Sequence, residues 1–112
     1  MAHRKYIFGR FCVPTHTKAE YRERVTDDHH AQKHTGRDIE RIIRHALNEI
    51  ENVETLPKLN VGYIAEVVFA VKNGYTQPYY IPLKHDINKN CEYVACSIWT
   101  RDIYESMRSG RD

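Results

Sequence analysis

The sequence predicts an α+β domain with a small antiparallel sheet of about four strands, two helices from the N-terminal half packed on one face, and a short C-terminal helix. Three observations predict it. Residues 39–50 carry the clearest helical periodicity in the chain. Residues 61–100 hold extended stretches separated by turn residues. The chain has 112 residues, and such a length buries roughly 65% of its unfolded surface, so we expect one core and a single domain over residues 1–112.

The N-terminal quarter predicts one strand and one polar helix. Lys5–Val13 is rich in aromatic and β-branched residues and is closed by a proline, which is typical of a strand. Thr17–Glu20 (T-K-A-E) matches a capping box, so we expect a helix to begin at Lys18. Tyr21 and Val25 are its only large apolar residues, which predicts that this helix is not deeply buried.

The second predicted helix is amphipathic. Thr35–Asp38 (T-G-R-D) resembles an N-terminal capping signal, and we expect the helix to run to about Asn52. Arg37, Arg41 and Arg44 lie on its polar side, which predicts a solvated ridge, with contact to nucleic acid as the alternative. The apolar residues share the opposite face at the helical period: Ile39, Ile42, Ile43, Ala46, Leu47 and Ile50.

The C-terminal half predicts a meander of strands. Val61–Lys72 alternates with apolar residues on both faces, which is typical of a central strand. Asn73-Gly74 is a hairpin signal, and Tyr75–Leu83 would be the return strand. The prolines in that return strand predict that it lies at an edge or is bulged. The remaining expected segments are a loop over Val53–Leu59, a last strand over Cys91–Thr100 and a helix over Asp102–Arg108.

One face of the predicted sheet is left uncovered by the two larger helices. The apolar stripe of the second helix covers one face, so the other would present Glu66, Tyr93, Ser97 and Trp99. Tyrosine and tryptophan are suited to protein interfaces and to stacking on nucleobases. We therefore expect an exposed contact surface there.

The cysteines and the lengths of the apolar runs indicate in which cellular compartment the protein is expected. Cys12, Cys91 and Cys96 are odd in number and show no C-x-x-C spacing, so we interpret them as small buried hydrophobes, with Cys96 an inert thiol. No apolar run approaches the roughly 18 residues that span a membrane, and no secretory apolar core follows the N-terminus. The prediction is a cytoplasmic protein with no membrane contact.

Positive charge is concentrated in the N-terminal part of the chain. The net charge is +2, but residues 1–44 hold ten Lys and Arg against six Asp and Glu. Five of the seven histidines also lie in the first 34 residues. A basic surface permits binding to a polyanion such as RNA, although such an imbalance is also ordinary on a small protein.

A histidine cluster before the second helix is the main candidate for chemistry. Metal-free cleavage of RNA needs a base for the 2′-hydroxyl, an acid for the leaving oxygen and a cation for the phosphate. His30 and His34 are the acid/base candidates, and Lys33 and Arg37 would contact the phosphate. Ser97 would complete the catalytic set. The expected contacts to substrate are Tyr93, Trp99, Thr100 and Glu66, besides Arg37.

A metal site is the alternative use of the same histidines. His30 and His34 are spaced i, i+4, as two zinc ligands on one helix face are, and Asp27 could be a third ligand. The H-E-x-x-H pattern is absent, and no further His or Cys has a ligand spacing. We therefore predict no metal and no other cofactor.

The order of these features resembles a known group of small ribonucleases. The sequence H-A-Q-K-H (His30 to His34) is followed by a helix and then by strands, with Ser97 or Thr100 in the last strand. This pattern resembles the barnase, EndoU, colicin-D and RelE-like superfamily, which includes toxin domains and phage-encoded relatives. The resemblance covers roughly Val25 to Thr100. The chain departs from it in its modest charge.

That resemblance implies a metal-independent endoribonuclease, often acting on tRNA or mRNA. His30, Lys33 and His34 would match the basic residues of the family, and Ser97 or Thr100 the polar residue of the last strand. A toxin of this kind implies an antitoxin or immunity protein as partner. The alternative is a non-catalytic interaction protein, such as a phage-type inhibitor, that binds a host protein or a nucleotide through the Tyr/Trp face.

Overall fold

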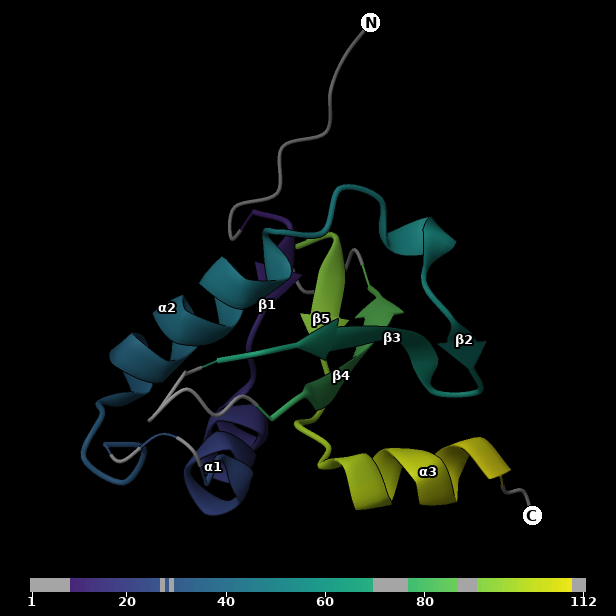
Figure 1. Ribbon diagram of the computed structural model, residues 1–112. Coiled ribbons are helices and arrows are strands. Elements are labelled where there is room, and N and C mark those ends of the chain that lie inside the picture. The colour runs from purple at the N-terminus through teal and green to yellow at the C-terminus, as the bar shows by residue number, and fades with distance from the viewer. Residues whose placement is uncertain (1–8, 27, 29, 70–76, 87–90, 110–112) are drawn as a thin grey trace, which may run out of the picture.

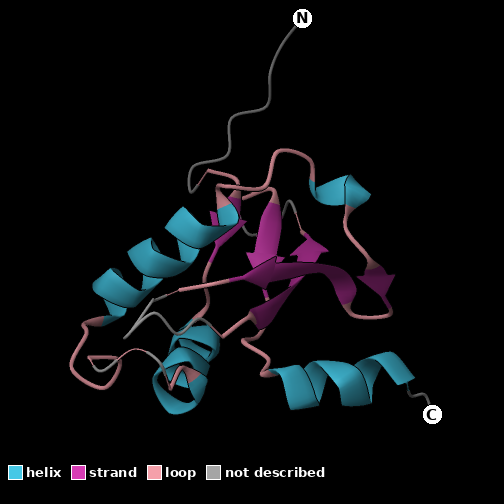
Figure 2. Cartoon of the chain, viewed as in Figure 1, coloured by secondary structure: helices cyan, strands magenta, loops and turns pink. Residues whose placement is uncertain are grey.

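A computed structural model of the protein describes residues 9–26, 28, 30–69, 77–86 and 91–109 and shows an α+β fold, as predicted (Figures 1 and 2). The sheet has five strands in the order β1-β5-β4-β3-β2. It is mixed, because β1 pairs with β5 in parallel while the other neighbours are antiparallel. The elements are β1 (Phe11–Cys12), α1 (Thr15–Arg24), α2 (Gly36–Leu47), the short 3-10 helix η1 (Val53–Thr55), β2 (Lys58–Leu59), β3 (Gly62–Val67), β4 (Tyr79–His85), β5 (Tyr93–Ala95) and α3 (Arg101–Ser109).

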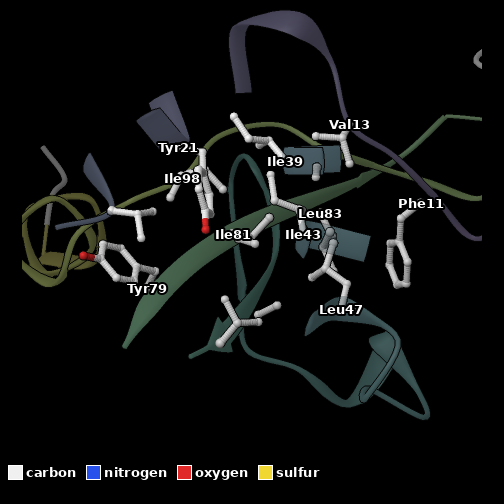
Figure 3. Packing of buried hydrophobic residues seen from close by; sticks show 14 of the residues in the cluster. Phe11, Val13, Tyr21, Ile39, Ile43, Leu47, Tyr79, Ile81, Leu83 and Ile98 are labelled. Carbon is white, nitrogen blue, oxygen red and sulfur yellow. The ribbon is translucent and has the colours of Figure 1, made fainter. Parts of the chain in front are cut away.

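Helix α2 packs on the sheet through the predicted apolar stripe. Ile39, Ile43 and Leu47 are fully buried, and Figure 3 shows them beside Ile81 and Leu83 of β4. The predicted capping box is present, with the Thr35 hydroxyl accepting from the Asp38 amide at 3.1 Å and the Asp38 carboxylate accepting from the Thr35 amide at 3.2 Å. The helix ends at Leu47 rather than near Asn52, because the chain tightens into a turn there.

Strand β4 lies in the centre of the sheet and pairs regularly with β3, so the prediction that this strand lies at an edge or is itself bulged is wrong, and the bulge lies in the facing segment after β5. Leu83 is opposite Ala95, and Tyr80 is opposite Trp99. The segment from Ala95 to Trp99 is therefore one residue longer than the part of β4 that it faces. The extra residue falls opposite Pro82, which has no amide hydrogen to donate. The proline is tolerated in a central strand because the facing segment leaves regular pairing there.

Helix α3 covers the sheet face opposite α2, so the predicted exposed Tyr/Trp surface is wrong. Trp99 is 6% exposed and packs with Tyr80 and Ile64 under α3, and the rings of Tyr80 and Tyr104 stack 4.2 Å apart. Tyr93 is 5% exposed and belongs to the cluster on the α2 side. The bulge separates these two aromatic residues, because an extra residue reverses the alternation of faces.

Helix α1 is buried along one side in spite of its polar sequence. Thr17 and Tyr21 are both fully buried. The helix begins at Thr15 after Pro14, with no side-chain cap, so the predicted start at Lys18 is wrong. Thr17 makes a tertiary contact instead, because its hydroxyl donates to the Ala95 carbonyl at 2.7 Å.

The N-terminal strand is joined to the sheet covalently. Cys12 in β1 forms a disulfide with Cys91, which lies just before β5 and 79 residues away in sequence. The interpretation of these two residues as unpaired buried cysteines is therefore wrong. Cys96 is a free, half-buried thiol, and burial raises its pKa, which keeps it protonated and weakly nucleophilic.

Some predicted features fall outside the described residues. These are the Asn73-Gly74 turn, the beginning of the Lys5–Val13 strand, and the residues Asp27 and His29. The segment Val53–Leu59, predicted as a loop, contains the short helix η1 and the strand β2. Within the described part of the chain, no helix is both long and apolar enough to cross a membrane.

Candidate active site at the histidine turn

Residues 30–34 form a tight turn between α1 and α2, which we call the histidine turn. The His30 carbonyl accepts from the amides of Lys33 at 2.8 Å and His34 at 2.9 Å. Ala31 is 3% exposed and packs into the main core. Because this small apolar side chain points inward, the turn presents the side chains of His30 and Lys33 to solvent.

A hydrogen-bond network orients His34. The Asp28 carboxylate accepts from the buried Tyr21 hydroxyl at 2.6 Å and lies 3.2 Å from Nε2 of His34. Its other oxygen accepts from the His30 amide at 2.9 Å. One carboxylate thus connects α1 to both histidines of the turn.

The environment of Asp28 favours its charged form. Partial burial raises the pKa of this carboxyl. The hydrogen bonds from the Tyr21 hydroxyl and the His30 amide, together with the neighbouring His34 imidazole, lower the pKa by more than burial raises it. The net pKa of Asp28 therefore lies below its ordinary value of 3.8. A carboxylate that stays ionised can hold an imidazole in one orientation.

The two imidazoles stand near each other without being bonded to each other. The ring centres of His30 and His34 are 6.2 Å apart, and the rings are inclined by 66°. The His34 side chain is 27% exposed, and His30 is exposed. Two imidazoles at this separation can act on two different oxygens of one bound phosphate.

The backbone around the turn is held by the neighbouring elements. The Arg22 guanidinium donates to the His34 carbonyl at 2.8 Å. The Tyr79 hydroxyl on β4 accepts from the Thr26 amide at 2.9 Å, which fixes the chain as it leaves α1. These contacts on both sides restrict the geometry of the turn, which acid/base chemistry by its side chains would require.

The structure brings together part of the predicted site. His30, Lys33 and His34 lie on the histidine turn, and exposed Arg37 lies in the first turn of the helix that follows. Lys33 and Arg37 are the cations nearest to the histidines along the chain. These are the residue types that acid/base chemistry on a phosphate ester would require.

The other predicted site residues have different surroundings. The Ser97 hydroxyl donates to Glu20 on α1. The Thr100 hydroxyl accepts from the Ile103 amide at 3.4 Å, at the beginning of α3. Glu66 is exposed on β3 and lines a groove beside α2. Tyr93 and Trp99 are buried, so they offer no stacking surface in this structure.

Sequence reasoning did not assign a role to Asp28 or Tyr21. Asp28 stands just before the histidines in the sequence. This position could indicate its role, since carboxylates often orient a catalytic or ligating imidazole. Tyr21 was recognised only as an apolar residue of a polar helix. Its role depends on a contact seven residues along the chain, around a bend that periodicity does not predict.

Neither a metal-binding cluster in the described part of the chain nor a known relative indicates a function for this protein. Within the described residues, no group of three or more His, Cys, Asp or Glu is arranged to hold a metal ion. Comparisons with protein-family models, with curated proteins and with solved structures gave no significant match. The function is therefore argued from the geometry of the histidine turn.

Proposed function

We propose that this protein is a metal-independent endoribonuclease that cleaves RNA by histidine acid/base chemistry at the histidine turn. The observation that carries the proposal is the Tyr21–Asp28–His34 network, with the second imidazole of His30 6.2 Å away between ring centres. A carboxylate that orients an imidazole is a recurrent arrangement for general base catalysis. The exposed cations Lys33 and Arg37 supply the charge that a phosphate ester requires.

The network assigns different tasks to the two histidines. Because the Asp28 carboxylate accepts a hydrogen bond, Nε2 of His34 carries the proton that faces it. Nδ1 of His34 is then the atom that takes the proton of the ribose 2′-hydroxyl. The 2′-oxygen attacks phosphorus, and protonated His30 gives its proton to the departing 5′-oxygen. The products are a 2′,3′-cyclic phosphate and a free 5′-hydroxyl, so no metal or further reactant is required.

The setting of this activity follows from the same proposal. A toxin-like ribonuclease requires an antitoxin or immunity protein in the cell that makes it, and we propose the cytoplasm as its place of action. The Cys12–Cys91 disulfide is of a kind formed in oxidising compartments. A ribonuclease delivered from one cell to another passes through such a compartment before it reaches RNA.

The first test is cleavage of total RNA in EDTA. The wild type should cleave, and His30→Ala combined with His34→Ala should not. His85→Ala is the matched control, because His85 is also exposed but lies at the end of β4. The rate of the wild type should show a bell-shaped pH dependence, since it needs one group deprotonated and another protonated. Equal cleavage by all three proteins, or by none, would overturn the proposal.

A second test concerns Asp28. Asp28→Asn keeps the shape of the side chain but can present an amide hydrogen to His34 in place of an acceptor. We expect a loss in cleavage rate on the order of 100-fold, with RNA affinity retained. The measurement is single-turnover cleavage beside Glu23→Gln, a change of a 75% exposed side chain on α1. An Asp28→Asn protein as fast as the control would exclude the proposed orienting role.

A further inference from the structure

A basic cleft lies between α1 and the outer face of α2. Its volume is about 570 Å³, and its walls include Lys18 from α1 and Arg37, Arg41, Arg44 and His45 from α2. These residues come from two helices and are spaced one turn apart along α2. The cleft begins at the end of α2 that follows the histidine turn.

The cleft concentrates positive charge. Four permanent cations line it, and Glu40 is the single carboxylate among the lining residues that the structure describes. This excess exceeds the net charge of the whole chain, which is +2. A concentration of one sign of charge in a concave surface raises the local concentration of an oppositely charged ligand.

Glu40 neutralises only one side of the cleft. It lies 3.7 Å from Nζ of Lys18 and 3.0 Å from the Arg44 guanidinium, so it holds both cations in place. Arg44 also donates through Nε to the Phe11 carbonyl at 3.0 Å. Glu40, Lys18 and Arg44 therefore form a fixed wall that joins α1, α2 and β1.

Arg37 and Arg41 are the cations of the cleft that remain available to a ligand. Both are exposed, and within the described residues no carboxylate lies within ion-pair distance of either guanidinium. The hydrogen bonds with Thr35 lower the pKa of Asp38, and the charge of Arg41 lowers it further, so a negative charge on a ligand would also be attracted to Arg41. Guanidinium groups bind phosphate oxygens in a bidentate manner.

The amides at the N-terminus of α2 are not the source of this attraction. The capping box occupies the Asp38 amide, and the Asp38 carboxylate stands at that terminus. An anion attracted to the cleft would therefore be bound by side chains. Side chains on successive turns of a helix suit a chain of phosphates more than a single compact anion.

We propose that the basic cleft is a second phosphate-binding site, where the RNA backbone beyond the cleaved bond passes from Arg37, beside the histidine turn, onto Arg41 of α2. This inference rests on the proposed ribonuclease function and extends it along the substrate. Lys18 lies over Gly36, with its Nζ 3.7 Å from where a Cβ would stand. Lys18 therefore stands at the end of the cleft that is next to the histidine turn.

The test is the salt dependence of binding to a single-stranded RNA whose riboses carry 2′-O-methyl groups, which prevents cleavage. Arg41→Gln is the cleft variant, because Arg37 also belongs to the proposed catalytic site. It should reduce the slope of log K against log salt by about 0.7, which is the contribution of one phosphate contact on a single strand. The corresponding loss in affinity is about 5-fold in about 0.1 M salt. Arg101→Gln on α3 is the control, because it removes the same charge from another exposed surface.

The outcomes separate this inference from the proposed function. If the cleft variant and the α3 variant lose affinity equally, with the same slope, the binding is non-specific and the second site is excluded. If the cleft variant alone changes the slope, the site is supported even where the wild type does not cleave RNA. Adding Arg41→Gln to the His30→Ala/His34→Ala protein should reduce its slope by the same amount as in the wild type, because the cleft lies outside the histidine turn. If the histidine variant loses slope and the cleft variant does not, the phosphates are held by the histidine turn and not by the cleft.

Discussion

Helices α1 and α2 are neighbours of similar length, but they are held to the protein by different forces. Helix α2 buries Ile39, Ile43 and Leu47 against the sheet. Helix α1 carries a buried side that is largely polar and hydrogen-bonds to backbone groups. The comparison teaches that a polar sequence does not imply a solvent-exposed helix when a neighbouring segment has backbone groups that lack strand partners.

The bulge opposite Pro82 explains why α1 is polar. Residues 96–98 leave regular pairing there, and the Cys96 carbonyl and both backbone groups of Ile98 would otherwise have no strand partner. Side chains of α1 satisfy them in turn. Nε2 of His16 contacts the Cys96 carbonyl at 2.8 Å, Glu20 accepts from the Ile98 amide at 3.0 Å, and Arg24 donates to the Ile98 carbonyl at 2.9 Å.

The largest effect is expected from truncation in the α2 region. Ile43 is fully buried, so Ile43→Ala removes buried methyl groups and leaves a cavity, which should lower the free energy of unfolding by about 3 kcal/mol. Urea unfolding measures this loss. Ile42→Ala is the matched control, because Ile42 is only partly buried. An equal loss in both variants would mean that α2 does not pack through the stripe centred on Ile43.

A smaller effect is expected in the α1 region, where a hydrogen-bond acceptor is removed. Glu20→Ala leaves the Ile98 amide and the Ser97 hydroxyl without their acceptor and should cost about 2 kcal/mol in the free energy of unfolding. Glu20→Gln keeps an acceptor oxygen and should cost less. The comparison is made by urea unfolding, with Glu23→Ala as the exposed control. If Glu20→Ala were as stable as Glu23→Ala, the hydrogen bonds that Glu20 accepts would not contribute to holding α1 against the sheet.

The same contrast shows how much of the structure was predictable from the sequence. The stripe from Ile39 to Leu47 and the Thr35–Asp38 cap are local patterns, so α2 and the α+β class could be predicted. The placement of β4 in the sheet centre depends on the bulge, which is a relation between two distant segments. The burial of Trp99 depends in the same way on where α3 lies.

The candidate site also contains a part that local sequence predicts and a part that depends on contacts between distant segments. His30, Lys33 and His34 lie within five consecutive residues, so their proximity could be predicted from the sequence alone. The network through Asp28 requires Tyr21 to reach across the bend after α1, and no periodic pattern encodes that contact. The residues predicted from the distant strand, Ser97 and Trp99, acquired structural partners instead, because the bulge and α3 decide their surroundings.

The smallest effect is expected in how the free energy of unfolding changes with pH. Two carboxylates contribute to it, Asp38 in α2 and Asp28 in the bend after α1. Asp38 is bonded locally to Thr35 in α2, whereas Asp28 is bonded to Tyr21 and His34 across the bend after α1. The pKa of each lies below the ordinary value of 3.8. A lowered pKa means that each carboxylate stabilises the folded state above that pH and that this contribution is lost as the pH falls through the folded pKa.

Asp28→Asn and Asp38→Asn should therefore each be less stable than the wild type at pH 6, and each difference should shrink as the pH falls below 3.8. Adding Tyr21→Phe separates the two, because it removes the hydroxyl that bonds to Asp28. The double-mutant cycle of thermal unfolding should show coupling between Tyr21 and Asp28 and none between Tyr21 and Asp38. Equal coupling in both pairs would mean that Tyr21 acts on the whole α1–α2 unit. Coupling confined to Asp28 would place the orientation of His34 under the control of α1, the helix whose polar sequence gave no sign of that role.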